Sequence, residues 1–353
     1  MPETVLVTGG SGLVGGDTIR RLAADGWRVV ATTNRNPIAG LPAGVETRRV
    51  DLTDAAAVRN LVADVAPNAI VHLAAVIPPL LYRDRAAARR VNVDASAALV
   101  KAAEAQANPP HLVYASSSGV YGARNPHRNK GLLRADTPLG PCELYGGHKL
   151  EVERLVQAAE LPWTVLRLGG VISADPAAVA VSSDLLYLSG LVPNDSEVHT
   201  VDTRDVATAF AATLSTGVTN EVLLIGGDDS NLLRHRQVAE GFAAAQGVKL
   251  PPSRPGNPES DIDWYPAADW MDVERSQELL KYQDHSWPEL LDELRFNIGW
   301  KRYPTRLAAP LIRFALARLS PYRSTPGQYA DPWGAIRARF GDPSLDNLPD
   351  PLG

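Results

Sequence analysis

Thr8-Gly9-Gly10-Ser11-Gly12-Leu13-Val14-Gly15 is the stretch of this 353-residue chain that decides its fold. The apolar run Val5-Leu6-Val7 precedes it, and residues 13–25 follow with apolar side chains at helical spacing until Gly26. The pattern predicts a strand, a tight turn and a helix. Its spaced glycines would let the backbone bend sharply and approach a pyrophosphate, while the helix N-terminus would offer free N–H groups to the phosphates. The stretch is therefore interpreted as a dinucleotide-binding loop.

The composition narrows the range of partners and compartments. A net charge of −5 gives no basic surface for nucleic acid, so no nucleic-acid partner is expected. The single cysteine, Cys142, excludes an internal disulfide and an all-cysteine metal site, and no metal is expected. No apolar run approaches the length of a membrane span, and the N-terminus has no signal-peptide pattern. We expect a cytoplasmic protein without a membrane span.

Predicted strands and helices alternate along the first 120 residues. Strands are expected over residues 28–32, 45–50, 69–73 and 111–115, and a long alanine-rich helix over 83–107. This alternation predicts an α/β fold, a doubly wound parallel sheet of Rossmann type with its ligands at the carboxyl ends of the strands. A sixth strand is expected over residues 163–168.

The length suggests one large domain with a smaller lobe. We expect an NAD(P)-binding domain over residues 1–170 that also uses parts of 200–230. Residues 171–300 would form mainly a substrate-binding lobe, and residues 301–353 a C-terminal helical extension and tail.

The end of the second predicted strand carries Asn34 and Arg35 and no carboxylate. In folds of this type an acidic residue there binds the ribose 2′-hydroxyl, whereas an arginine accommodates a 2′-phosphate. The sequence therefore favours NADP over NAD as cofactor. The alternative is that Arg35 is only a solvated loop residue.

Tyr145 and Lys149 stand four residues apart and would share one face of a predicted helix. A tyrosine titrates near ~10, and a neighbouring ammonium lowers that pKa by favouring the phenolate. Tyr145 would then exchange a proton with an alcohol or carbonyl as a hydride moves. Ser117, in the serine-rich segment after the strand at 111–115, would hydrogen-bond the same oxygen. Ser117, Tyr145 and Lys149 are the predicted catalytic residues.

With these motifs the chain resembles the extended short-chain dehydrogenase/reductase superfamily, specifically its NAD-dependent epimerase/dehydratase family. The resemblance covers about residues 4–300, and it rests on the 8–15 turn, Asp51-Leu52, residues 72–75, residues 116–122 and Tyr145-x-x-x-Lys149. It implies that Tyr145 is the acid/base and Lys149 its ribose-binding partner. It places the catalytic serine four residues before Tyr121, at Ser117, with Ser118 as the fallback. A homodimer is a further expectation at the level of the family.

The motifs and the resemblance together give a set of expected cofactor contacts. They are Gly9, Ser11, Gly12, Leu13, Val14, Gly15, Asn34, Arg35, Asp51, Leu52, Leu73, Ala74, Ala75, Tyr145, Lys149, Leu168 and Val171. Two further polar residues are expected to be structural. His72 is flanked by apolar residues, as a core histidine would be, and Asn92 lies inside the long helix.

The substrate region departs from the pattern of the family. The arginine that the family often places before the strand at Val201, to bind a diphosphate, is not evident. Residues 76–82, 179–181 and 185–188 are apolar, and they would line a substrate cavity or pack the two lobes together. His199, Asp202 and Arg204 are unranked candidates for polar specificity, and Asp205 is a candidate helix cap.

The C-terminal region carries a basic amphipathic pattern over residues 303–322. Such a helix can lie on a membrane, but packing on its own domain or on a second subunit is favoured. From about Gly341 the composition is that of a flexible or docked tail.

These features predict an NAD(P)-dependent oxidoreductase that transfers hydride between nicotinamide and a carbonyl or alcohol carbon of a small, partly apolar substrate. One alternative is a nucleotide-sugar epimerase or dehydratase that oxidises its substrate transiently. A second alternative is a cofactor-sensing protein without turnover.

Overall fold

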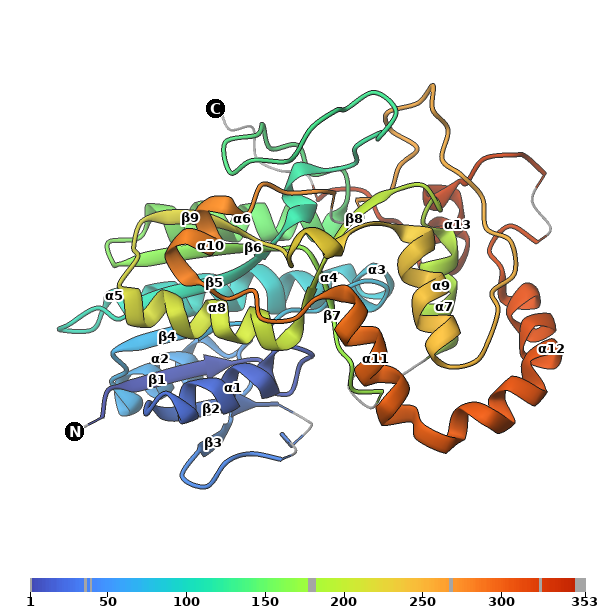
Figure 1. The fold of residues 1–353 in the computed structure, drawn as a ribbon. Coiled ribbons are helices and arrows are strands. Elements are labelled where there is room, and N and C mark those ends of the chain that lie inside the picture. Colours follow the sequence, from blue (N-terminus) through green and yellow to red (C-terminus); the bar gives the residue numbers. More distant parts are fainter. Residues whose placement is uncertain are drawn as a thin grey trace.

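A seven-stranded parallel sheet forms the centre of the computed structural model, which describes residues 2–34, 37–38, 40–176, 182–266, 269–323 and 326–346. The strand order is β3-β2-β1-β4-β5-β6-β9 (Figure 1). The strands are β1 (Thr4–Thr8), β2 (Arg28–Thr33), β3 (Glu46–Arg49), β4 (Ala69–His72), β5 (His111–Ser117), β6 (Trp163–Leu168) and β9 (Glu221–Ile225). The order reverses between β1 and β4, which is where such sheets bind their ligands.

Helices cover both faces of this sheet, so the predicted doubly wound α/β fold is confirmed. On one face α1 (Gly15–Ala24) and α8 (Thr203–Thr216) pack on Val5 and Val7. On the other face α2 (Ala55–Val65), α5 (Ala95–Glu104) and α6 (Leu144–Ala158) pack on Leu6. Because successive strand residues point to opposite faces, the run Val5-Leu6-Val7 contributes to two separate cores.

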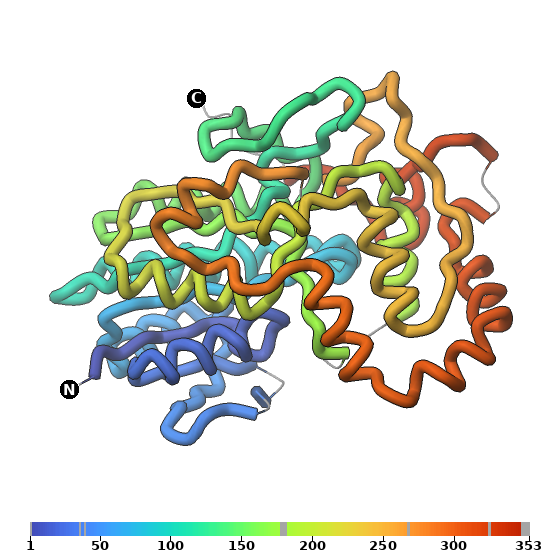
Figure 2. Tube along the Cα trace, viewed as in Figure 1, coloured from blue at the N-terminus to red at the C-terminus, as the bar shows by residue number. Residues whose placement is uncertain are grey.

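A small second sheet lies beside the carboxyl ends of the large one. Its order is β10 (Leu232–Arg234), β8 (Glu197–Asp202) and β7 (Gly170–Ile172). The helices of this region are α7 (Ser183–Leu191), α9 (His235–Ala245), α10 (Glu274–Leu280), α11 (Trp287–Ile298), α12 (Arg302–Leu319) and α13 (Pro332–Arg339), with short turns η3 (Asp229–Asn231) and η4 (Gly299–Lys301). Figure 2 shows that α11 and α12 form the end of the molecule opposite the N-terminus.

The long helix expected over residues 83–107 is largely confirmed, but it contains a π-helical turn that the sequence did not indicate. Residues 85–104 are helical without a break, as α4 (Arg85–Arg89), the π-helical turn η1 (Arg90–Asp94) and α5, and the short α3 (Leu80–Arg83) precedes them. Asn92 lies in the π turn, where its side chain accepts a hydrogen bond from the N–H of Val76 at 2.7 Å and donates one to the carbonyl of Val76 at 2.9 Å. This long-range bridge supports the expectation that Asn92 is structural.

The sequence analysis gave Asp205 as a candidate cap of α8, but it is not the cap. The cap is Asp202, whose carboxylate accepts from the N–H of Arg204 at 2.8 Å. Asp205 is fully buried in the first turn, and its carboxylate lies 2.6 Å from Nδ1 of His285. Asp202 is the cap instead because α8 begins three residues earlier than a cap at Asp205 would require.

The tail from Gly341 is docked as far as residue 346, the last described. The carbonyl of Pro343 accepts from the N–H of Leu144, the first residue of α6, at 2.9 Å. Asp346 pairs with Arg85 at 2.8 Å and lies 3.0 Å from Nε2 of His148. The tail therefore holds the start of α6 from outside.

Two features are absent from the described ranges. No helix there is both long and apolar enough to cross a membrane. Nor do histidine, cysteine, aspartate or glutamate side chains in those ranges gather in threes to hold a metal ion.

Candidate active site

A cavity of about 570 Å³ opens at the carboxyl ends of β1, β4, β5 and β6. It brings together most of the residues that the sequence predicts for a site. Those that line it are Gly9, Gly12, Leu13, Val14, Gly15, Leu73, Ala75, Ser117, Tyr145, Lys149, Leu168 and Val171. Segments more than 150 residues apart thus converge on one space, although their roles there remain predictions.

The glycine loop is closed by backbone contacts that leave no room for side chains. A Cβ at Gly9, whose φ is +74°, would lie 2.6 Å from the backbone nitrogen of Ala74, and one at Gly15 would lie 2.5 Å from the carbonyl oxygen of Gly10. Helix α1 begins at Gly15 without a side-chain cap. The N–H of Gly15 donates to the carbonyl of Gly12 at 3.1 Å, while the positive end of the α1 dipole faces the loop and favours an anion such as a pyrophosphate. These features fit a dinucleotide.

Ser117 ends β5, whereas Tyr145 and Lys149 lie in the first turns of α6. The ammonium of Lys149 donates to the carbonyl of Ala115 at 2.6 Å and lies 5.6 Å from the centre of the Tyr145 ring. Tyr145 and Ser117 share a side-chain hydrogen bond. The three predicted catalytic side chains are thus neighbours on the wall of the cavity.

The electrostatics of this group differ from the expected ones. Burial raises the pKa of Tyr145 above its usual value, the carboxylate of Glu143 raises it further, and the hydrogen bond with Ser117 opposes them. Burial lowers the pKa of Lys149 itself to about 8, so its ammonium is still charged at neutral pH. In the protein alone burial and Glu143 dominate the pKa of Tyr145, and the expected effect of Lys149 on that pKa during the reaction stays a prediction.

Glu143 is a cavity residue that the sequence reasoning missed. It is buried, caps α6 through the N–H groups of Tyr145 and Gly146, and accepts from the hydroxyl of Tyr82 at 2.9 Å. That hydroxyl also lies 3.4 Å from the hydroxyl of Tyr265, another lining residue. An acidic residue two positions before Tyr145, at the expected start of a helix, is the signal that could have indicated it.

His72 is a satisfied core histidine, as expected. Its Nδ1 lies 2.6 Å from Oγ1 of Thr8 and its Nε2 2.8 Å from Oγ of Ser96. Burial lowers the pKa of His72 to about 3, so the ring is neutral at physiological pH. It joins β4 to β1 and α5 beneath the cavity.

Four further expected cofactor residues, Asp51, Leu52, Ala74 and Asn34, are not among those that line the cavity. Asp51 accepts hydrogen bonds from the N–H and the hydroxyl of Thr53 at 3.0 and 2.8 Å, while Leu52 packs partly buried against the core. Ala74 lies behind the glycine loop. Asn34 is exposed at the end of β2, and Arg35 falls outside the described residues.

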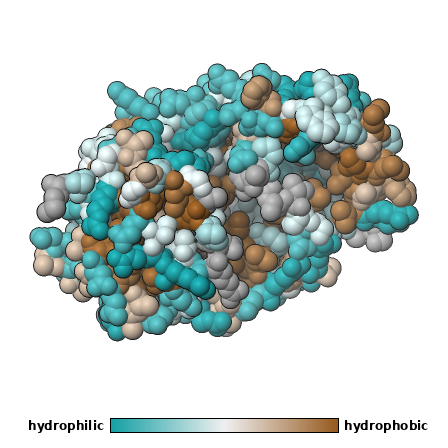
Figure 3. Space-filling model, turned by 90° about the horizontal axis from the view of Figure 1, so that it is seen from below, coloured by the Kyte–Doolittle hydropathy of each residue, from teal (hydrophilic) through white to brown (hydrophobic). Residues whose placement is uncertain are grey.

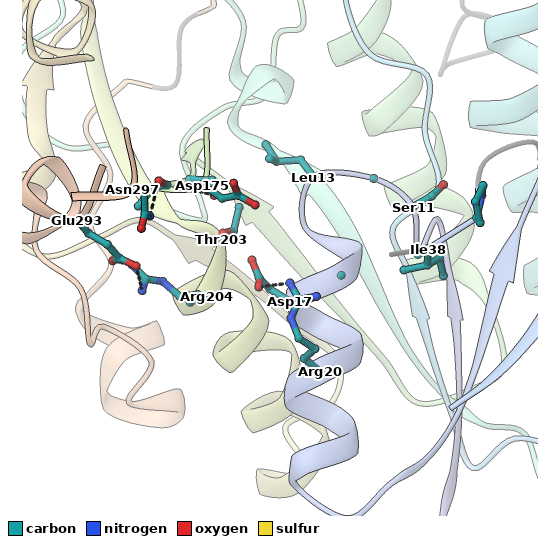
Figure 4. Close-up of a pocket in the computed structure, with 16 residues that line it drawn as sticks. Ser11, Leu13, Asp17, Arg20, Ile38, Asp175, Thr203, Arg204, Glu293 and Asn297 are labelled. Carbon is teal, nitrogen blue, oxygen red and sulfur yellow. Dashed lines mark hydrogen bonds and ion pairs between the residues drawn. The ribbon is translucent and has the colours of Figure 1, made fainter. Parts of the chain in front are cut away.

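A second cavity of about 440 Å³ borders the outer side of the same loop, between α1, α8 and α11 (Figure 4). Ser11 lies on its wall. Its charged groups are paired with one another, Arg20 with Asp17 at 2.7 Å and Arg204 with Glu293 at 2.8 Å. We therefore assign the reaction space to the first cavity.

The three unranked polar candidates serve the fold rather than the cavity. His199 is buried, its Nε2 lies 2.9 Å from the carbonyl oxygen of Gly227, and it is not among the residues that line the cavity. Arg204 pairs with Asp202 at 2.7 Å on the side of the second cavity. None of them lines the space beside Tyr145.

The sequence left open whether the apolar segments line a substrate cavity or pack the two lobes together. Their described residues do both. Ile77, Leu185 and Leu188 line the cavity, whereas Leu81 lies in a buried cluster with the C-terminal Ile336 and Phe340. Residues 179–181 lie outside the described residues.

Comparisons with known proteins agree with this geometry. The UDP-glucose 4-epimerase of Thermus thermophilus, solved in complex with NAD, superposes with a TM-score of 0.67 at 22% identity, covering 83% of this chain and 98% of that one. "UDP-glucose 4-epimerase 2" of Oryza sativa subsp. japonica is 27% identical over 73% of this chain and 74% of its own length.

"Methionine adenosyltransferase 2 subunit beta" of Bos taurus is 33% identical over 195 residues, 54% of each chain. This chain thus spans about half the length of the adenosyltransferase relatives that it matches. The sequence profile of the NAD dependent epimerase/dehydratase family matches residues 5–226, which contain the glycine loop, Ser117, Tyr145 and Lys149. The chain belongs to the NAD-dependent epimerase/dehydratase family.

Proposed function

We propose that the protein is an oxidoreductase that uses a nicotinamide cofactor to interconvert a carbonyl and an alcohol on a small, partly apolar substrate. The observation that carries this proposal is the convergence of Ser117, Tyr145 and Lys149 with the glycine loop on one cavity. The cofactor would supply the hydride or accept it. Membership of the family supports a nicotinamide cofactor of either type.

The chain's own residues have distinct roles in this proposal. In the reductive direction Tyr145 gives its phenolic proton to the carbonyl oxygen as the carbon receives a hydride, and in oxidation the phenolate takes that proton back. Ser117, already hydrogen-bonded to Tyr145, aligns the same oxygen. Lys149 binds the cofactor ribose and favours the phenolate once the oxidised ring adds its positive charge.

The lining of the cavity supports the substrate class. Ile77, Leu185 and Leu188 make part of the wall apolar, and Val192 and Val198 add to it. Lys149 is the one lysine or arginine among the described lining residues, whereas a diphosphate is bound by several cationic groups. His235 does not replace them, because burial lowers its pKa to about 4.

We also propose a preference for NADP. The support is the sequence at the end of β2, Asn34 followed by Arg35, with no carboxylate for a ribose 2′-hydroxyl. Titration of the protein with NADP and NAD tests it, since tighter binding of NAD would overturn the preference. Arg35→Ala should weaken NADP more than NAD.

We propose that the chain has a cofactor-binding part, a mainly substrate-binding part and a C-terminal extension, with the bounds expected from the sequence. Residues 1–170, with α8 and β9 from the 200–230 region, would hold the cofactor, because β9 pairs with β6 and α8 packs beside α1. Residues 171–300 would hold mainly the substrate, and residues 301–353 would form the extension.

The main alternative keeps the same site but oxidises its substrate only transiently, as an epimerase or dehydratase of a nucleotide-linked sugar would. The family and the name of the rice relative favour it. A third candidate, a non-catalytic protein, is favoured by the adenosyltransferase relative, which is named as a subunit.

One experiment separates the three. The purified protein is mixed with NADPH or NADH and a panel of apolar ketones and aldehydes, and absorbance of the reduced cofactor is followed. Net consumption supports the proposal, and Tyr145→Phe should lower kcat by about 100-fold or more while cofactor still binds. Turnover of a nucleotide sugar without net cofactor consumption would overturn the proposal in favour of the epimerase. Cofactor binding without any turnover would favour the non-catalytic protein.

A further inference from the structure

The outward face of α12 carries large apolar side chains without a partner. Leu307 is 86% exposed and Leu311 75% exposed, and Tyr303 and Phe314 are also exposed. Their spacing of three or four residues sets them along one side of the helix. None of the residues of α12 is buried. Exposed apolar groups gathered in this way mark an interaction surface.

The inward face of α12 already has its partner. Leu316 and Leu319 line a small cavity of about 120 Å³ together with Leu186 of α7. The expected packing of the amphipathic helix on its own domain thus accounts for this side. The helix therefore has two apolar sides, and the chain covers one of them.

Two further large apolar side chains are exposed just before α12. They are Phe296 of α11 and Trp300 of η4. We call Phe296, Trp300, Tyr303, Leu307, Leu311 and Phe314 the α12 face. Figure 3 shows apolar atoms gathered at the end of the molecule where α12 lies.

The segment that carries most of the α12 face is basic. Residues 294–330 contain no aspartate or glutamate, although the whole chain has a net charge of −5. Their cations are Arg295, Lys301, Arg302, Arg306, Arg313, Arg318 and Arg323. In the part of the chain that the structure describes, Arg306, Arg313 and Arg318 form no ion pair, and all three are exposed. The guanidinium of Arg318 lies 4.4 Å from the centre of the Phe314 ring, so a cation accompanies the apolar stripe itself.

We propose that the α12 face binds an anionic lipid surface. A helix with exposed leucines and aromatics on one side, and cations beside them, can place its apolar side chains among lipid chains and its cations at the headgroups. Tryptophan and tyrosine favour that boundary, which fits Trp300 and Tyr303. A second copy fits less well, because pairing two α12 faces would set these cations against one another.

The lipid surface would then lie one helix away from the reaction cavity. Helix α7 contacts α12 through Leu186, while Leu185 and Leu188 of the same helix line the cavity. An apolar substrate held in the membrane would have a short path to Tyr145. This consequence rests on the proposed function, whereas lipid binding itself does not.

Sedimentation with vesicles tests the proposal on the full chain. We expect binding to phosphatidylcholine vesicles that contain about 30 mol% phosphatidylglycerol, and weak binding to phosphatidylcholine alone. High salt should reduce the binding. Arg306→Glu with Arg313→Glu should weaken it by about 30-fold or more, since each cation near an anionic surface contributes about a factor of five and the reversed charge adds repulsion. Leu307→Asp with Leu311→Asp should abolish it.

Matched controls keep the result specific to this face. Leu132→Asp with Leu139→Asp changes two exposed leucines elsewhere, and Arg59→Glu with Arg154→Glu reverses two exposed charges elsewhere. Both controls should sediment as the unaltered protein does, and thermal unfolding should show that every variant is folded.

Three outcomes would overturn the proposal. The first is no binding to either vesicle, and the second is equal loss in the control variants. The third is a concentration-dependent dimer, without vesicle binding, that the Leu307 and Leu311 changes abolish. That result would assign the face to a second copy of the chain.

Discussion

The hydroxyl of Tyr82 donates a hydrogen bond of 2.9 Å to Glu143 and thereby holds a buried carboxylate beside Tyr145. The same carboxylate accepts from the N–H of Tyr145 at 2.7 Å. Burial raises the pKa of Glu143, and the hydrogen bonds to its carboxylate oppose that effect. A negative charge at this position disfavours the phenolate of Tyr145, whose pKa it raises.

Glu143→Gln should therefore make Tyr145 easier to ionise. The change removes the charge and keeps the size, so the pKa of Tyr145 should fall, and alcohol oxidation near neutral pH should become severalfold faster relative to reduction. The pH profile of kcat in the oxidative direction measures it. Glu151→Gln, on the same helix but paired with Arg89 at 2.6 Å, is the control and should leave the profile in place. An unmoved profile in Glu143→Gln would contradict the electrostatic role.

Gly9→Ala and Gly16→Ala form a matched pair in the glycine loop and the helix that follows it. An alanine at Gly9 would be strained by its positive φ and would press on the backbone of Ala74, at a cost of about 1–3 kcal/mol in the free energy of unfolding. At Gly16 the nearest atom is 3.4 Å away, on the flexible side chain of Arg20, so alanine should stabilise α1 by up to about 1 kcal/mol. Urea denaturation and cofactor titration check both. Equal effects at the two sites would contradict the close-approach argument.

The residues that the sequence predicts well are those fixed by local geometry. Three glycines after an apolar run, or Tyr145 and Lys149 one helical turn apart, determine where backbone and side chains lie without reference to distant residues. The order of strands and helices follows from the same short-range patterns. These are the features that place the cavity.

The features that the sequence did not predict depend on contacts between residues that are far apart in the chain. Glu143 meets Tyr82 across 61 residues, and Asn92 bridges to Val76 through a π turn that periodicity does not reveal. The pKa of Tyr145 is governed mainly by burial, which only the assembled fold determines. Spacing alone placed Lys149 beside Tyr145, but it could not indicate how strongly burial acts on that phenol.

Glu153 and Arg167 form a buried ion pair. Removing only one of the two charged side chains should lower the free energy of unfolding strongly. The guanidinium donates to the carboxylate at 2.7 Å, and Arg167 also donates to the hydroxyl of Tyr121 at 2.7 Å. Glu153→Ala leaves a buried unpaired cation and should lower the free energy of unfolding by about 3–5 kcal/mol. Glu153→Leu with Arg167→Met should cost much less, because it removes both charges and retains the volume.

Urea denaturation of these variants measures the cost. The exposed pair of Arg236 and Glu240 is the control, and Glu240→Ala should change stability by less than about 1 kcal/mol. A single variant as stable as the unaltered protein would show that the pair does not hold β6 to α6.

Lys149→Met should change the pH dependence of stability in a defined direction. Burial lowers the pKa of Lys149 from 10.5 to about 8 in the folded protein. Below pH 8 the ammonium is charged in both states, and its desolvation destabilises the folded state by roughly 3 kcal/mol. Between pH 8 and 10.5 the unfolded chain binds more protons than the folded one, so the contribution of Lys149 to stability rises with pH.

The measured quantity is the free energy of unfolding of the unaltered protein minus that of Lys149→Met, from urea denaturation at a series of pH values. This difference should be negative or small near neutral pH and should increase from pH 8 to 10.5. The hydrogen bond to Ala115 offsets part of the desolvation, so the slope tests the buried ammonium better than the absolute value. Lys101→Met, on the exposed side of α5, is the matched control and should give a flat difference. A flat or falling difference for Lys149→Met would mean that the lysine beside Tyr145 is hydrated, and the account of the cavity as a desolvated site would fail with it.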